Sequence, residues 1–136
     1  MKVESAIIYA DGAARGNPGP AAIGATIKDE QGRLIACISQ RIGHATNNQA
    51  EYRAVIAALE KAIRLGADDI ELNSDSELVV KQLRGEYRVK RVTLKLLYER
   101  VRQLQGKLEL LTVRHIPREQ NVEADNLANR AFTKFC

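Results

Sequence analysis

Four acidic residues stand in four separate segments of this 136-residue chain, each in a context that could support chemistry. Asp11 follows the apolar run AIIYA, and Glu51 lies near the start of TNNQAEYRAVIAALE. Asp75 follows the strand-like run DIELNS, and Asp125 belongs to the closing segment NVEADNLANRA. Carboxylates that are brought together repel one another unless a cation neutralises them. If folding gathers these four, they form a site for hard divalent ions, which prefer oxygen ligands.

The elements that must position these acids can be inferred from turn residues and apolar periodicity. The expected order is β-β-β-α-β-α-α-β-α. The strands are expected at 3–10, 22–28, 33–41, 69–74 and 108–116, and the helices at 46–65, 76–84, 93–105 and 121–134. A hairpin followed by alternating helices and strands predicts a mixed five-stranded sheet with helices on both faces. We expect residues 1–136 to form a single domain of this α/β type.

The same elements give each acid a predicted place. Sites in such sheets form at the carboxyl ends of strands, where the sequence puts Asp11 and Asp75. Glu51 is expected in the first turn of its helix, where the macrodipole favours an anion. Asp125 borders the packed face of the last helix, where a carboxylate is costly unless it is paired. Any one of these acids could be a cap, a turn former or a solvated side chain, but four at once favour a site.

Composition and charge narrow the class of protein. The chain is 45% hydrophobic and 28% charged, which is ordinary for a globular domain. Its longest uninterrupted apolar run, 54–59, is far too short to cross a membrane, and no signal-peptide pattern is visible. The net charge of +4 would grow if metal neutralised the four acids, and that surplus suits a polyanionic partner.

The two cysteines carry little information. Cys37 and Cys136 match no metal-binding or disulfide spacing pattern. A reducing cytoplasm fits them best, and a bridge between the two stays an open alternative.

Four blocks of the chain have a familiar order. DGAARGNPGPAAIG, TNNQAEYRAVIAALE, NSDSELVVKQLRG and REQNVEADNLANRA resemble the successive motifs of type 1 ribonuclease H, over about residues 7–131. The resemblance implies an endonuclease that hydrolyses the RNA strand of RNA–DNA hybrids and leaves 5′-phosphate and 3′-hydroxyl ends. It implies two Mg²⁺ ions as cofactors, with Mn²⁺ as a substitute. By position, it assigns catalytic and metal-binding roles to Asp11, Glu51, Asp75 and Asp125.

The resemblance also assigns substrate contacts. Asn17, Asn47 and Asn48 match family positions that touch the minor groove of the hybrid, where an amide can both donate to and accept from a 2′-hydroxyl. Gly12 stands where the lack of a side chain permits close backbone approach. From the residues alone, Asn17 before Pro18 is turn chemistry and Asn47 could cap a helix, so both interpretations stay open.

The chain departs from the best-known members near its last strand. His115 stands ten residues before Asp125, at the offset of a mobile histidine that is thought to assist turnover. Here it lies in VRHIPREQN rather than in a glycine-bearing loop, so Arg118 or Glu119 is the alternative for that working position. Glu77 stands where many members carry a glutamine that helps to recognise the hybrid.

A second departure lies between the predicted helix at 76–84 and the last predicted strand. Some members insert a basic, tryptophan-containing protrusion there, whereas this chain has no Trp and a short basic stretch that includes Lys90 and Arg91. This resembles a compact form of the family. The stretch either contacts the DNA strand of the hybrid or is an ordinary solvated helix face.

Other classes of function stay open at this point. The chain could be a non-catalytic nucleic-acid-binding module, although the presence of all four acids argues against a decayed site. It could be another nuclease of the same fold, although the GNPGP and TNNxxE contexts argue against that. Some compact members also accept duplex RNA, and the sequence leaves that side activity open. We expect a monomer whose partner is an RNA–DNA hybrid.

Overall fold

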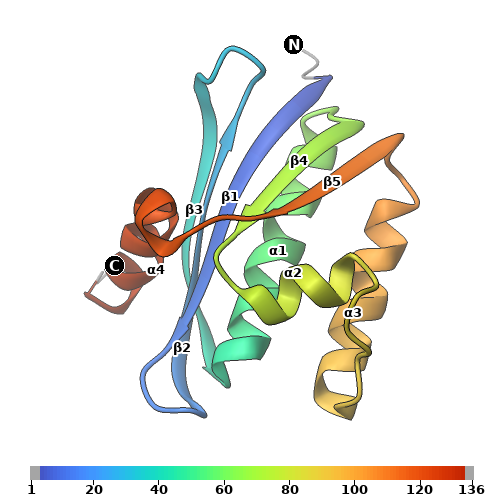
Figure 1. The fold of residues 1–136 in the computed structure, drawn as a ribbon. Helices are drawn as coiled ribbons and strands as arrows, with labels where there is room; N and C mark the ends of the chain where they lie inside the picture. Colours follow the sequence, from blue (N-terminus) through green and yellow to red (C-terminus); the bar gives the residue numbers. More distant parts are fainter. Residues whose placement is uncertain (1–3, 134–136) are drawn as a thin grey trace.

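The computed structural model describes residues 4–133, which form a five-stranded sheet with helices on both faces (Figure 1). The strands are β1 (Ser5–Ala14), β2 (Gly19–Lys28), β3 (Leu34–Ala45), β4 (Asp69–Ser74) and β5 (Leu110–His115). The helices are α1 (Asn47–Arg64), α2 (Glu77–Leu83), α3 (Val92–Gln105) and α4 (Val122–Thr133), with a short 3₁₀ turn, η1 (Arg118–Gln120), before α4. The predicted order of elements is confirmed, with the 3₁₀ turn as an addition.

The strands lie side by side in the order β3-β2-β1-β4-β5. β1, β2 and β3 pair antiparallel, whereas β4 is parallel to β1 and β5 is parallel to β4. The helices α1, α2 and α3 cover one face of this sheet, and α4 packs alone on the other face (Figure 1). The predicted mixed five-stranded sheet with helices on both faces is therefore confirmed.

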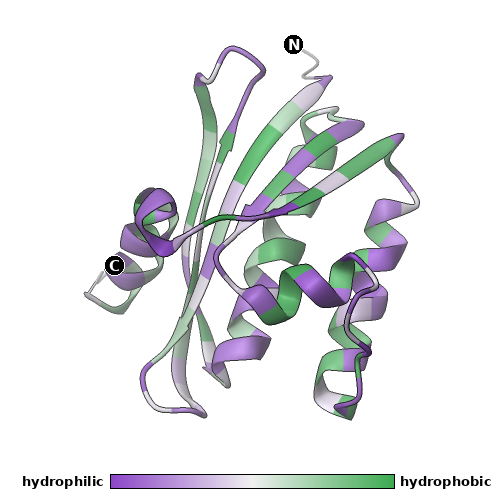
Figure 2. Ribbon diagram, in the orientation of Figure 1, coloured by the Kyte–Doolittle hydropathy of each residue, from purple (hydrophilic) through white to green (hydrophobic). Residues whose placement is uncertain are grey.

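Period-two alternation along the strands builds the core between the sheet and α1. Hydrophobic and hydrophilic residues alternate along β4 (Figure 2), and its Leu72 is fully buried together with Ile8 of β1. Tyr52 of α1 is the largest fully buried side chain, and its hydroxyl donates to Gln82 Oε1 of α2 at 2.6 Å. This buried bond satisfies both polar groups and fixes α2 against α1.

Strand boundaries differ from the prediction at the hairpin. β1 continues to Ala14, so Asp11 lies inside the strand rather than at its end, and β3 continues to Ala45. The extension pairs small residues such as Ala13 with Ala22, whose weak strand propensity hid it. Backbone hydrogen bonds to the neighbouring strand hold these residues in place instead.

Helix ends follow their local signals more closely. Thr46, rather than Asn47, caps α1 through a capping box with Gln49, and Gly66 follows the helix at a φ of 99°. Ser76 caps α2, and Gly85 follows it at a φ of 80°. A positive φ is the conformation that favours glycine, which explains why both helices stop where the sequence predicts.

A few predictions fall outside the described residues, namely the strand start at Val3, the helix end at Lys134 and the bridge to Cys136. Cys37 is exposed on β3. Among residues 4–133, none of the helices has both the length and the apolar character of a membrane span. The cytoplasmic location and the monomeric state stay predictions.

Candidate active site and metal centre

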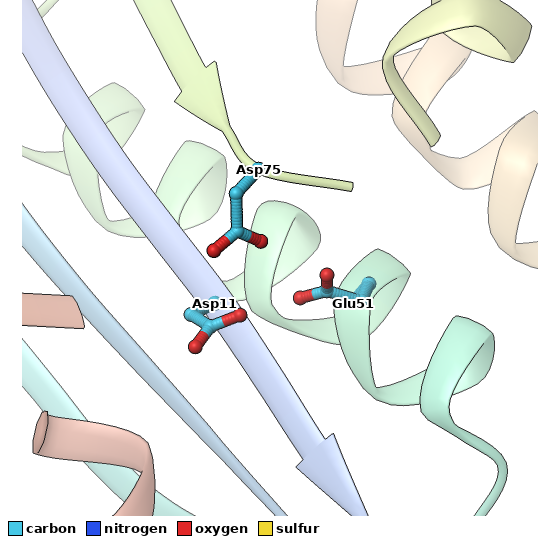
Figure 3. Close-up of side chains that lie close together, drawn as sticks. All are labelled: Asp11, Glu51 and Asp75. Carbon is cyan, nitrogen blue, oxygen red and sulfur yellow. The ribbon is translucent and has the colours of Figure 1, made fainter. Parts of the chain in front are cut away.

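Three acids from three different elements converge on one point. Carboxylate oxygens of Asp11 on β1, Glu51 on α1 and Asp75 after β4 lie within 4.8 Å of one another. The three side chains point toward each other (Figure 3). Asp11 is only 7% exposed, and the other two are half-buried. The fold therefore gathers three of the four predicted acids in one partly desolvated cluster.

This arrangement disfavours the charged form of the acids. Burial raises the pKa of Asp11 far above its usual range, and repulsion from Glu51 and Asp75 raises it further. Burial likewise raises the pKa of Glu51, although hydrogen bonds from Asp11 and the Gly12 backbone oppose the rise. Without a cation, the cluster must therefore retain protons at neutral pH.

Gly12 is the residue that lets α1 deliver Glu51 to this point. Its backbone N–H donates to Glu51 Oε1, and a Cβ at Gly12 would collide with the backbone of Ala50. The sequence predicted Glu51 in the first turn of α1, but the helix begins at Asn47, so that prediction is wrong. The Glu51 carboxylate is therefore stabilised locally by the hydrogen bond from the Gly12 N–H rather than by the helix dipole.

Asp75 occupies a turn that two serines define. Ser74 ends β4 and its hydroxyl accepts from the Ser76 N–H at 3.1 Å, while the Ser76 hydroxyl accepts from Val79 N–H at 3.3 Å. These bonds join the strand directly to α2 through an N-cap. Asp75 therefore lies at the carboxyl end of a strand, as predicted.

Asp125 approaches the cluster from α4, on the other face of the sheet. It is half-buried, and its contact with Asp11 contributes to the raised pKa of Asp11. Buried Asn121 donates through Nδ2 to the carbonyl of Ala10 at 3.0 Å, which ties the start of α4 to the residue before Asp11. This role of Asn121 was not predicted, although its place four residues before Asp125 could have suggested one.

The predicted substrate-binding asparagines meet at the junction of the hairpin and α1. Asn17 Oδ1 accepts from the Asn47 N–H at 3.0 Å, and Asn47 Oδ1 accepts from the Ala14 N–H at 3.0 Å. The Asn17 and Asn47 side chains are exposed, and Asn48 is half-buried beside them. Within residues 4–133 the side-chain NH₂ groups of Asn17 and Asn47 donate no hydrogen bond.

His115 and Arg118 each act on one acid of the cluster. His115 ends β5, and its Nε2 lies 3.3 Å from the carbonyl oxygen of Asp75. Arg118 lies on η1, and its positive charge lowers the pKa of Glu51. Glu119 is exposed on the same 3₁₀ turn. The structure thus puts both predicted alternatives, His115 and Arg118, next to an acid of the cluster.

The remaining substrate candidates are exposed. Glu77 forms an ion pair with Lys81, with 3.0 Å between Oε1 and Nζ, and this lysine lowers the pKa of Glu77. An ionised carboxylate cannot donate to a 2′-hydroxyl. Lys90 and Arg91 lie between α2 and α3, directly after Arg88 and Val89, which line a surface groove.

The residues present fit a hard divalent cation. The ligand atoms of the cluster are all carboxylate oxygens, with no thiolate or imidazole among Asp11, Glu51 and Asp75. Such a set suits Mg²⁺ or Mn²⁺ better than softer metals. A cation would also offset the repulsion that raises the pKa of Asp11.

Comparison with known proteins finds several ribonucleases H among the relatives of this chain. The profile of a family described as Reverse transcriptase-like matches residues 9–131. Ribonuclease HI from Halobacterium salinarum is 49% identical over 124 residues, which are 91% of this chain and 62% of that protein. The crystal structure of RNase H1 from Halobacterium salinarum NRC-1 has a TM-score of 0.93 at 46% identity, covering 95% of this chain and 98% of that one. LC11-RNase H1, solved in complex with an RNA/DNA hybrid, has a TM-score of 0.90 at 45% identity. The match covers 94% of this chain and 96% of that one.

Proposed function

Because this chain belongs to the type 1 ribonuclease H family, we propose that it hydrolyses the RNA strand of RNA–DNA hybrids in the presence of Mg²⁺. The observation that carries the proposal is the convergence of the Asp11, Glu51 and Asp75 carboxylates within 4.8 Å. The similarity to LC11-RNase H1, which was solved with an RNA/DNA hybrid, supports the choice of substrate. The chain spans 62% of the Halobacterium ribonuclease HI, so the proposal concerns the activity of this domain.

The four acids are proposed to hold a pair of Mg²⁺ ions. Bound there, the ions would orient and acidify an attacking water and neutralise the leaving 3′-oxygen, leaving 5′-phosphate and 3′-hydroxyl ends. Asp11 is only 7% exposed, Glu51 is held in place by the Gly12 N–H, and Asp75 is held by its serine turn. Asp125 completes the set from α4.

Selection of RNA over DNA is proposed to reside in the asparagine junction. Asn17 and Asn47 each use their side-chain oxygen internally, which leaves their NH₂ groups as donors toward a 2′-hydroxyl. Asn48 is proposed to contact the same groove. Gly12 is reassigned from direct substrate contact to support of Glu51, because its N–H is already engaged.

The basic residues and Glu77, which lie outside the group of four acids, are proposed to have separate roles in binding and turnover. Arg118 is proposed to stabilise the ionised Glu51 carboxylate and to attract the substrate phosphate. His115 is proposed to assist turnover beside Asp75. Lys90 and Arg91 are proposed to bind phosphates of the DNA strand, and Glu77 to stabilise α2 through Lys81.

A panel of labelled substrates tests the proposal. RNA–DNA hybrid, duplex RNA, duplex DNA and single strands are incubated with the protein, each with Mg²⁺, with Mn²⁺ and with chelator. We expect cleavage of the RNA strand of the hybrid that requires a divalent ion, and end analysis showing 5′-phosphates. Cleavage of duplex DNA would instead indicate another nuclease of this fold.

The same panel separates catalysis from binding alone. Tight binding of the hybrid without any cleavage would indicate a non-catalytic nucleic-acid-binding module. Cleavage of duplex RNA beside the hybrid would add the side activity seen in some compact members. The Asp11→Asn variant serves as the control for contaminating nucleases.

A further inference from the structure

Asp125 is the one of the four predicted acids that lies outside the cluster of Asp11, Glu51 and Asp75. It lies on α4, on the sheet face opposite α1 (Figure 1), and is not part of the group whose oxygens all lie within 4.8 Å. Its contribution to the pKa of Asp11 shows that the two carboxylates are neighbours. The place of the Asp125 carboxylate therefore depends on how α4 is seated and on what holds the side chain.

The backbone of α4 is fixed on the sheet at three levels. Gly24 on β2 allows close contact, because a Cβ there would collide with the carbonyl oxygen of Ala124. On β3, Ser39 Oγ donates to the carbonyl of Leu127 at 2.6 Å. Arg41 donates to two carbonyls in the last turn of α4, each at 2.7 Å. With the backbone held in this way, the main remaining freedom of Asp125 is rotation of its side chain.

Asn129 restricts that rotation. It follows Asp125 by one helical turn, and side chains four residues apart on a helix are neighbours. Asn129 Nδ2 donates to the backbone carbonyl of Asp125 at 3.0 Å and to its carboxylate Oδ1 at 3.2 Å. The second bond selects one orientation of the carboxylate and leaves Oδ2 unengaged by Asn129.

We propose that Asn129 is a positioning residue that holds the Asp125 carboxylate in its metal-binding orientation. The inference rests on the proposed function, which supplies the role of Asp125 as a metal ligand. Mutation of a residue that orients a metal ligand typically lowers metal affinity or activity by about 10- to 100-fold. Because Asn129 is exposed and water competes for the same bond, we expect an effect at the low end, about tenfold.

The test is an Asn129→Ala variant of the full chain. Alanine favours the helix more than asparagine does, so α4 should be retained. The Mg²⁺ concentration that gives half-maximal hydrolysis of the hybrid should rise about tenfold, and KM for the hybrid should stay unchanged. Calorimetry of Mg²⁺ binding to the free protein should show weaker binding as well. Asn129→Gln, which retains an amide donor, should recover part of the loss.

Asn126 provides the matched control. It is an exposed asparagine on the same helix, and within residues 4–133 its side chain makes no hydrogen bond. Asn126→Ala should therefore keep the wild-type Mg²⁺ dependence in both measurements. An Asn129→Ala variant that matches Asn126→Ala in either measurement would overturn the proposal.

An Asp125→Asn background separates positioning from a general effect on α4. If Asn129 acts through the Asp125 carboxylate, adding Asn129→Ala to Asp125→Asn should cause little further loss. If Asn129→Ala weakens the Mg²⁺ dependence as much in the Asp125→Asn background as in wild type, the proposal would also be overturned. A wild-type protein that fails to cleave the hybrid would instead remove the proposed function, and calorimetry would still compare Asn129→Ala with Asn126→Ala.

Discussion

The cluster formed by Asp11, Glu51 and Asp75 and the basic segment between α2 and α3 are built in opposite ways. The cluster is set into the core: Asp11 is 7% exposed, and the Gly12 N–H binds Glu51 across the contact between β1 and α1. Its charges are desolvated, so a small displacement changes their energies strongly.

The basic segment lies almost entirely in solvent. Lys90 and Arg91 are exposed, and the neighbouring apolar side chains of Val92 and Leu96 are 75% and 72% exposed. Interactions between solvated charges are weak and are screened by salt. On the proposed function, the chemistry of this domain would depend on precise packing, and its binding of substrate would depend on charges that can vary without cost to the fold.

The largest expected effect tests the cluster directly. Asp11→Asn should reduce hydrolysis of the hybrid to the background level, because a neutral amide cannot replace the carboxylate toward Mg²⁺. In chelator, the same variant should be more stable than wild type at neutral pH, as measured by thermal melting. An active, Mg²⁺-dependent Asp11→Asn protein would contradict the assignment.

The sign of the stability effect follows from linkage. The folded-state pKa of Asp11 lies above its unfolded value of about 4, so the folded state binds the proton more tightly. The stability that this proton contributes is present below that value and declines as the pH rises toward the folded pKa. Metal-free wild type should therefore lose stability over this range more steeply than Asp11→Asn.

The next largest effect should come from Gly12→Ala. The added Cβ would collide with the Ala50 backbone and push α1 away from β1, at a cost of about 1–3 kcal/mol or more. Urea unfolding measures the loss, and hydrolysis should fall because Glu51 moves with the helix. Gly106→Ala, at the end of α3 where no such collision occurs, should change stability by less than about 0.5 kcal/mol. Equal stability of the two variants would show that the contact between β1 and α1 is not tight.

A smaller and kinetically different effect is expected in the basic segment. Lys90→Glu with Arg91→Glu should raise KM for the hybrid with little change in kcat or in melting temperature, because the phosphate contacts are proposed to act in binding. The slope of affinity against salt should fall by roughly one per lost contact. Lys107→Glu, beyond the other end of α3, is the control. Unchanged KM at low salt would leave this segment as a plain solvated surface.

The smallest effect should separate Arg118 from His115. Arg118 lowers the pKa of Glu51, so Arg118→Ala should raise that pKa and move the acidic limb of the activity profile to higher pH. We expect a shift of less than about one pH unit, since Arg118 is exposed. His115→Ala should leave this limb in place and lower turnover near neutral pH. Full turnover in His115→Ala would remove the proposed role of that histidine.

Much of the arrangement was predictable because the signals are local. Apolar periodicity and turn glycines predicted the order of elements, and Gly66 and Gly85 stop their helices as expected. The position of Asp75 directly after its strand was also predicted from the adjacent run DIELNS. Such signals depend only on residues close together in the chain.

The supporting contacts were not predictable, since they depend on register and helix docking. Asp11 pairs with Gly24 across the hairpin, and the lack of a side chain at Gly24 allows α4 to approach that acid closely. No local sequence pattern predicts this register. The extra length of β1 likewise reflects tertiary hydrogen bonds that override propensity. The Asn129 bond has a detectable spacing, but the same spacing is common on solvated helices.

The packing of α4 on the sheet has a consequence for biosynthesis. The last described helix binds strands made near the beginning of the chain, through Ser39 and Arg41. During translation, Asp11, Glu51 and Asp75 therefore emerge from the ribosome well before Asp125 does. On the proposed function, a growing polypeptide acquires its nuclease activity only once α4 has left the ribosome, so synthesis itself sets the moment at which cleavage can start.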